Sequence, residues 1–331
     1  MGKSDIAAKE FMEDNDVFAD VFNYLLYDGS PVIKADCLSS QDTVQSAMIA
    51  KNGEVLQLQK IRDVYKSCTL RTDGTTDYLL LGLEEQTDVS YIMPVRAMLY
   101  DALSYNRQAK AARRRHRRQQ DYRGHSSGEY LSGFCREERL TPVITAVVFL
   151  SEKPWDGPTQ LHDMLSIADP RLLPMIENYK LHLITPKALT KENLQKFNSS
   201  LREVLSFIKY SKDKEQLRVL VKGNPRFASL DKGAALVIRY CTHSDFKIDE
   251  QDKEERFNMC KALDDIRQEG FEDGQKIGLE IGLRGQVSML KNLMESLGVT
   301  AAKAMDLLKI TEPEQGKLMS MLNEGTDPRQ K

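Results

Sequence analysis

The sequence has few cysteines, and no two of them lie close together. An odd and scattered set argues against a disulfide framework and against a zinc knuckle. The five histidines are scattered in the same way, so the spacing of these residues predicts no site built from histidine and cysteine. The five cysteines are Cys37, Cys68, Cys135, Cys241 and Cys260.

Long hydrophobic runs are also missing. No run of about 18 apolar residues occurs, so we expect no transmembrane helix and no membrane partner. Residues 1–14 are polar and acidic and lack the apolar segment of a signal peptide. The formal net charge is −2, so the overall charge does not indicate a nucleic-acid binder. These absences together favour a soluble, cytoplasmic protein.

Patterns of apolar residues predict a mixed α/β fold. The chain has 331 residues, enough for one large domain and a smaller one. Alternation predicts strands, continuous apolar runs predict buried strands, and a spacing of three to four predicts helices. The expected order is a helix at 5–27, a hairpin at 43–58, strands at 61–70 and 77–84, a helix from Pro94, strands at 142–150 and 179–184, and helices at 190–210, 213–222 and 231–242. These elements form a predicted domain over residues 1–250.

The character of the chain changes after residue 250. Residues 251–285 form a charged linker in which Gly270, Gly274, Gly278 and Gly282 recur every four residues. Such a row either lets two helices approach closely or marks a frayed helical linker, because glycine weakens a helix. Residues 286–331 are expected to form a small module of three short helices. It is either a helix-turn-helix-like DNA reader or a dimerisation bundle, and its few lysines favour the bundle and a homodimer.

Three oxygen-bearing side chains lie at the ends of two neighbouring predicted strands. Asp63 stands early on one strand, and Glu84 and Gln86 end the next at positions i and i+2, which share a face. Oxygen ligands that converge on one point suit Mg²⁺ or Mn²⁺. Acidic residues at strand ends are more often merely solvated, so spacing alone does not decide. Glu85 points to the opposite face and is expected to be ordinary surface.

The order of several motifs resembles a known family. Asp63 followed by Leu83-Glu84-Glu85-Gln86 is similar to the D…ExQ variant of the PD-(D/E)xK nuclease superfamily. More narrowly, the chain resembles the bacterial recombination-promoting nuclease and putative transposase family over about residues 10–190. The further matching segments are FADVFN at 18–23, MPVR at 93–96, YDALSY at 100–105, LSGF at 131–134 and PWDGP at 154–158.

The resemblance implies a restriction-endonuclease-like core, a mixed sheet flanked by helices. It implies that Asp63 and Glu84 ligate the metal. Gln86 stands where the wider superfamily usually has lysine, and an amide can orient water or phosphate but supplies no charge. An acid of the first helix often completes such sites, and Asp20 is our candidate for a further metal ligand. A solvated helix face is the alternative for Asp20.

A run of basic residues follows the predicted catalytic helix. No acidic residue occurs between Asp101 and Asp121, and the gap is rich in arginine. This is the electrostatic footprint of a protein that binds a phosphate backbone. Cations also lie favourably at helix C-termini without binding DNA. The residues that we expect to contact DNA are Arg96, Arg113, Arg114, Arg115, Arg117 and Arg118.

The sequence thus predicts a metal-dependent DNA endonuclease linked to recombination or transposition, with Mg²⁺ or Mn²⁺ as its cofactor and DNA as its partner. The first alternative is a degenerate relative that binds DNA without cutting it. The second is a non-enzymatic helical interaction protein, which would have no affinity for DNA even at low salt.

Overall fold

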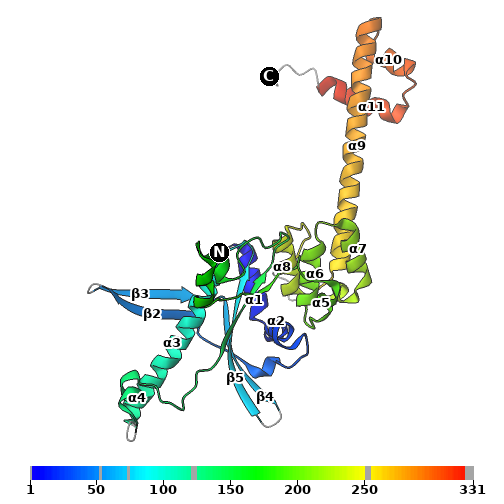
Figure 1. Cartoon of the computed structure of the whole chain (residues 1–331). Coiled ribbons are helices and arrows are strands. Elements are labelled where there is room, and N and C mark those ends of the chain that lie inside the picture. Colours follow the sequence, from blue (N-terminus) through cyan, green and yellow to red (C-terminus); the bar gives the residue numbers. More distant parts are fainter. Residues whose placement is uncertain (1, 52–53, 73–74, 121–124, 250–254, 325–331) are drawn as a thin grey trace. The chain divides into compact units, whose positions relative to one another are not determined.

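The chain divides into two compact units, Met1–Cys260 and Lys261–Lys331. Figure 1 draws the computed structural model, and each unit is described by itself. The predicted boundary at residues 250 and 251 lies outside the part that the structure describes. The described residues are 2–51, 54–72, 75–120, 125–249 and 255–324.

The predicted helix at 5–27 is in fact two helices, α1 (Lys3–Glu13) and α2 (Asn15–Tyr27). The chain breaks at Asp14, whose ψ of 132° is not helical and whose carboxylate accepts hydrogen bonds from the first backbone N–H groups of α2. The buried Lys66 ammonium donates to the Glu13 carbonyl at the end of α1. A side chain distant in sequence therefore stabilises a break that helical periodicity does not reveal.

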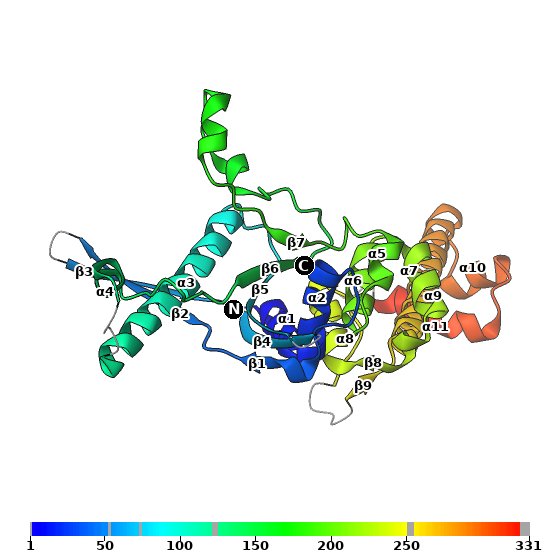
Figure 2. The same cartoon turned by 60° about the horizontal axis from the view of Figure 1, so that its bottom comes forward.

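The first unit is built on a five-stranded mixed sheet with the order β1-β4-β5-β6-β7 (Figure 2). β1 is antiparallel to β4, and β4 is antiparallel to β5. β5, β6 and β7 are parallel. The predicted mixed α/β class is confirmed. The strands are β1 (Leu38–Ser40), β4 (Val64–Thr72), β5 (Thr75–Gln86), β6 (Val143–Phe149) and β7 (His182–Ile184).

The predicted hairpin forms from β2 (Val44–Lys51) and β3 (Glu54–Ile61), which pair only with each other. A long helix, α3 (Met93–Gln119), connects β5 to the parallel strand β6. Pro94 lies in its first turn, where a missing N–H is harmless. α3 packs against β6 and β2, and its far end diverges from the hairpin toward α4 (Figure 1).

Helices cover both faces of the sheet. Lys66 on β4 points to the junction of α1 and α2, where it also contacts Asn15. Arg62, just before β4, and Thr145 on β6 point the other way, to Asp101 on α3. Apolar residues of β5 and β6 lie between these layers and are fully buried, so the sheet is a rigid platform for the residues at its strand ends.

The rest of the first unit is mostly helical. The predicted helix at 190–210 is two helices, α5 and α6, and a short helix, α4, lies between α3 and β6. α8 packs against α1 and α6. The bounds are α4 (Ser127–Ser132), α5 (Lys191–Gln195), α6 (Leu201–Tyr210), α7 (Lys214–Gly223), α8 (Lys232–Thr242), β8 (Leu230–Asp231), β9 (Arg256–Phe257), and short 3-10 turns at Ala35–Cys37, Leu161–Met164, Pro170–Met175 and Pro225–Ser229.

The second unit begins within one long helix, α9 (Met259–Leu297). From Met259 on, the predicted linker and the first of the predicted short helices are therefore one continuous helix. α10 (Ala301–Leu307) and α11 (Glu312–Glu324) follow, and the Thr300 side chain caps α10. Apolar residues of the three helices form a small core around Leu290 and Leu318. None of the helices in the described ranges has the length and hydropathy to span a bilayer.

Candidate active site

The site predicted from the two strands lies where β4 begins and β5 ends. Val64 pairs with Leu83 in the antiparallel register, which brings Asp63 beside Glu84. Asp63 precedes β4 at a bend and is half-buried. The two predicted metal ligands therefore approach each other, because β4 and β5 are antiparallel neighbours.

Glu84 is completely buried, with 0% exposure. One carboxylate oxygen accepts a hydrogen bond from Arg96 on α3 at 3.2 Å. The other, Oε1, has no hydrogen-bond partner. Burial, followed by the negative charge of Asp63, raises the pKa of Glu84 to about 8, although Arg96 acts in the opposite direction.

Glu85 is not the surface residue that alternation predicts. It is 7% exposed and points to the α1 face, where its carboxyl group shares a hydrogen bond with that of Asp63. Burial, followed by the charge of Asp63, raises the pKa of Glu85 to about 9. Burial also raises the pKa of Asp63. The prediction was wrong because α1 covers a strand end that would otherwise be open to water.

Three carboxyl groups thus share one strand end, and two of their buried oxygens, Glu84 Oε1 and Glu85 Oε2, have no hydrogen-bond partner. A buried acceptor without a partner costs free energy. Several carboxylates together also repel one another when ionised. Carboxylate oxygens are the hard donors that Mg²⁺ and Mn²⁺ prefer, so the chemistry of these side chains suits such an ion. Glu84 and Glu85 point to opposite faces of β5, and the three carboxyl groups do not converge on one point in this structure.

Gln86 ends β5 and is half-buried. Its side-chain N–H donates to the main-chain carbonyl of Glu85 at 2.6 Å. Gln86 is therefore next to the carboxyl cluster, and its amide is held by the backbone.

A buried network fixes the chain just before Asp63. Arg62, with 0% exposure, donates to Asp101 at 2.9 Å and to Thr145 at 2.7 Å. Its guanidinium lies 4.9 Å and 5.0 Å from the ring centroids of Tyr65 and Tyr100. Sequence reasoning missed this positioning role. The signal that could have revealed this role is an arginine at the start of an apolar strand, followed by a helix in which Asp101 has no basic residue one turn away.

Glycine at position 82 makes room for that network. A Cβ there would lie 1.8 Å from a terminal nitrogen of Arg62 and 3.2 Å from the Thr145 hydroxyl. The Gly82 backbone is extended and not strained, so the requirement is space alone.

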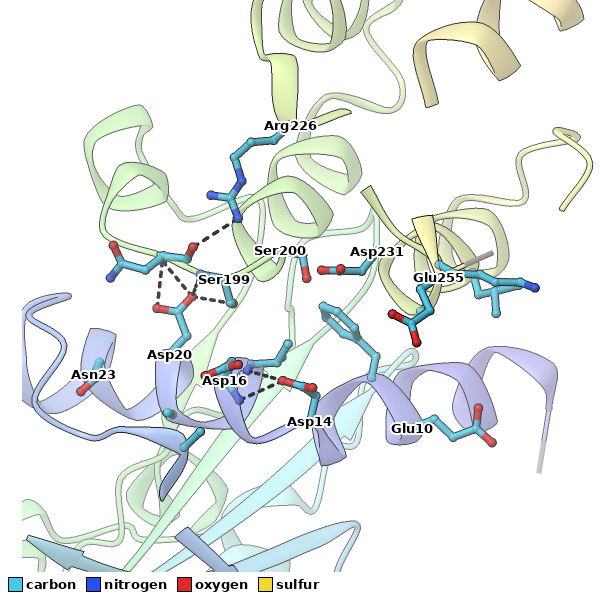
Figure 3. A pocket seen from close by; sticks show the side chains of 18 of the residues that line it. Glu10, Asp14, Asp16, Asp20, Asn23, Ser199, Ser200, Arg226, Asp231 and Glu255 are labelled. Carbon is cyan, nitrogen blue, oxygen red and sulfur yellow. Dashed lines mark hydrogen bonds between the residues drawn. The ribbon is translucent and has the colours of Figure 1, made fainter. Parts of the chain in front are cut away.

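Asp20 does not join the carboxyl cluster. Its carboxylate accepts hydrogen bonds from the backbone N–H groups of Asn198 and Ser199 and from the Ser199 hydroxyl. Figure 3 shows it turned toward Ser199, in a pocket lined by none of the predicted catalytic residues. Asp20 is thus a structural residue that holds the turn before α6, and we remove it from the predicted metal ligands.

The predicted DNA contacts lie in two places. Arg96 is 30% exposed and pairs with Glu84, so it lies at the carboxyl cluster. The other five lie in the last turns of α3, where all are exposed. Two of these have structural contacts, since Arg113 packs over Gly133 and Arg115 pairs with Glu138. Arg114, Arg117 and Arg118 are exposed, and a surface hollow is lined by Arg114, Arg115 and Arg118.

Comparison with protein-family models, with curated proteins and with solved structures gives no match to this chain. The function proposed below therefore rests on the motifs and on the geometry of the strand end.

Proposed function

We propose that the protein is a metal-dependent DNA endonuclease that hydrolyses phosphodiester bonds in recombination or transposition. The observation that carries this proposal is the cluster of Asp63, Glu84 and Glu85, with two buried oxygens that have no hydrogen-bond partner. A cluster that only stabilised the fold would pair these oxygens, because buried unsatisfied acceptors are rare in native proteins.

Asp63 and Glu84 would hold Mg²⁺ or Mn²⁺, and Glu85 adds a third carboxyl group that the sequence did not predict. When bound, such an ion lowers the pKa of water and neutralises charge on a phosphate. Arg62 holds the main chain at Asp63 through its buried pair with Asp101. That network keeps the Asp63 carboxylate next to the Glu84 carboxylate.

Arg96 and Gln86 have supporting roles in this proposal. Arg96 donates to Glu84 and partly offsets the rise in the pKa of that carboxyl group, and it is partly exposed, so it still has N–H groups for a phosphate. Gln86 is neutral, and its amide orients water or phosphate. It cannot supply the positive charge that the lysine of the wider superfamily supplies, so we propose that Arg96 supplies it.

The exposed arginines of α3 would carry most of the affinity for DNA. They lie in the last turns of α3, and Arg96, which pairs with Glu84 of the carboxyl cluster, lies in the first turns of the same helix. The five-stranded mixed sheet flanked by helices is consistent with the proposed restriction-endonuclease-like core.

The test is nicking of supercoiled plasmid by the full chain with Mg²⁺, Mn²⁺, Ca²⁺ or excess EDTA. We expect nicking with Mg²⁺ and Mn²⁺, and binding without nicking with Ca²⁺ and EDTA. Binding of DNA with no nicking under any metal would instead support a degenerate DNA-binding relative. Absence of both would overturn the proposal and favour a helical interaction protein.

A further inference from the structure

A second cluster of metal-binding side chains lies at the far end of α3. His116 is in the last turn of that helix, His125 precedes α4, and Cys135 and Glu138 follow α4. The spacing of histidine and cysteine along the chain predicted no such site. The prediction overlooked it because the chain reverses through α4, which brings residues 10 to 22 positions apart into contact.

The side chains converge with short distances. Cys135 Sγ lies 3.5 Å from His116 Nε2 and 3.3 Å from His125 Nδ1. His116 Nε2 lies 3.1 Å from a carboxylate oxygen of Glu138. The ligand atoms of His116, Cys135 and Glu138 all lie within 4.8 Å of one another. His116 and Cys135 are each 6% exposed, so the centre of the cluster is shielded from water.

The separations among His116, Cys135 and Glu138 match those of a tetrahedral zinc site, and His125 approaches this group through Cys135. Zinc–sulfur bonds of about 2.3 Å and zinc–nitrogen bonds of about 2.0 Å, at a tetrahedral angle, separate the two ligand atoms by about 3.5 Å. A thiolate with imidazoles is a soft ligand set that selects zinc over magnesium. One thiolate, one carboxylate and two neutral imidazoles also balance the charge of Zn²⁺.

The segment that carries these ligands has little else to hold it in place. α4 has six residues and none of them is buried. Tyr130 and Leu131 on α4 are 63% and 73% exposed, so the helix packs no apolar face against α3. Small elements without a hydrophobic core are commonly held by a metal or a disulfide. The cluster joins this segment to α3, together with the Arg115–Glu138 ion pair and the packing of Arg113 over Gly133.

We propose that His116, His125, Cys135 and Glu138 bind one structural zinc ion that joins the segment around α4 to the end of α3. On binding, the Cys135 thiol releases its proton to solvent and the sulfur forms a bond to the metal. The coordination is closed by four protein ligands, which is typical of structural and not of catalytic zinc. This ion is separate from the divalent ion proposed at the carboxyl cluster.

The zinc site fixes the arginines proposed to contact DNA. His116 lies between Arg115 and Arg117, and Arg115 shares the Glu138 carboxylate. Ordering this helix end would hold the exposed guanidinium groups in one arrangement, which lowers the entropic cost of binding a phosphate backbone.

The first test is the zinc content of the full chain, purified without chelator and measured by elemental mass spectrometry. We expect one zinc per chain in the parent, and near-complete loss in Cys135→Ser and in His116→Ala. The matched control Cys37→Ser removes a thiol elsewhere and should retain zinc. The proposal would be overturned if Cys135→Ser kept the zinc content of the parent. It would also be overturned if the parent contained no zinc and did not bind added zinc.

The second test does not depend on how the variants fold. Cobalt added to the zinc-depleted parent should give a sulfur-to-cobalt charge-transfer band and the intense visible bands of tetrahedral coordination, and one equivalent of zinc should remove them. Weak octahedral bands without a charge-transfer band would contradict the site. Asp63→Ala should keep its zinc, so failure of the nuclease proposal and failure of the zinc proposal are distinguishable.

Discussion

Glu84 and Glu85 are the residues at which burial and charge conflict most strongly. Both carboxyl groups lie against Asp63, and both have a raised pKa. Their folded pKa values of about 8 and about 9 exceed the usual 4.5, so between those limits the folded state binds more protons than the unfolded state. Their contribution to stability is therefore complete below pH 4.5 and is lost as the pH rises toward 9.

This gives an expected pH dependence for the zinc-loaded protein in the absence of magnesium. Its free energy of unfolding, measured with urea, should fall as the pH rises through this window. The double variant Glu84→Gln/Glu85→Gln should show a flatter profile, because neither amide titrates. Added Mg²⁺ should stabilise the parent more at high pH than at low pH. A variant with the parental slope would contradict the titration of these two groups.

Gly82 allows a second expectation at the residue scale. Gly82→Ala forces a methyl group against the buried Arg62 guanidinium. Overpacking of this kind costs about 1–3 kcal/mol, and the loss should be at the upper end because Arg62 cannot move away without breaking its buried ion pair with Asp101. Urea unfolding measures this loss. Gly157→Ala, where the atoms nearest to a Cβ belong to the side chains of Val89 and Trp155, is the milder comparison. An unchanged unfolding midpoint in Gly82→Ala would contradict the tight packing.

Some of these residue roles could be predicted from the sequence and others could not. Alternation places Glu84 and Gln86 on one face, because a local rule fixes which side chains share a face. The approach of Asp63 follows from the pairing of two strands that are neighbours in sequence. The burial of Glu85 depends on α1, and the role of Asp20 depends on residues 198 and 199. Those contacts join parts of the chain far apart in sequence, and no local pattern contains them.

Helix α3 is the element that joins the two proposed functions. Its first turns carry Arg96 at the carboxyl cluster, and its last turns carry the exposed arginines. The sequence predicted the start of this helix from Pro94, and the basic run that follows from its lack of acidic residues. It did not predict that the helix runs unbroken to Gln119, because the end of α3 is held by α4 and by the cluster around Cys135.

Replacing Arg114, Arg117 and Arg118 with alanine should weaken DNA binding for all sequences about equally. These three do not hold α4, unlike Arg113 and Arg115. Each lost phosphate contact should lower the slope of log affinity against log salt by roughly 0.9 for duplex DNA. Binding is measured by fluorescence anisotropy at several salt concentrations.

The matched control removes the same charge from one exposed face of α7, through alanine at Lys214, Arg218 and Lys222. We expect this variant to bind DNA almost as the parent does. Equal losses in the two triple variants would assign the effect to net charge, and would contradict a binding surface on α3.

The glycine row of α9 admits a simpler account than the close approach of two helices. At Gly274 and Gly278 a Cβ would meet nothing within 4 Å in its own chain. Gly274→Ala/Gly278→Ala should therefore stabilise the helix, by about 1 kcal/mol for each position. Circular dichroism measures helicity, and light scattering measures mass in solution. Loss of an oligomer in this variant would instead support helices that approach through the glycines.

At the scale of the whole molecule, the chain combines an α/β unit with a small helical unit. The sequence predicted this division from the change in composition near residue 250. It did not predict that α9 is one continuous helix, because glycine lowers helix propensity but does not by itself end a helix. The homodimer expected through the C-terminal helices stays a prediction.

The central claim is that the carboxyl groups at the end of β5 carry out metal-dependent cleavage of DNA. The direct measurement is the rate of plasmid nicking in Mg²⁺ by the parent, Asp63→Asn and Glu84→Gln, with DNA affinity measured in parallel. Asp77→Asn is the control, because Asp77 is an exposed carboxylate on the same strand. We expect the two site variants to bind DNA as the parent does and to lose at least about 100-fold in rate, as for loss of a principal electrostatic group. The control should nick normally. Parental nicking by Asp63→Asn or by Glu84→Gln would contradict the account.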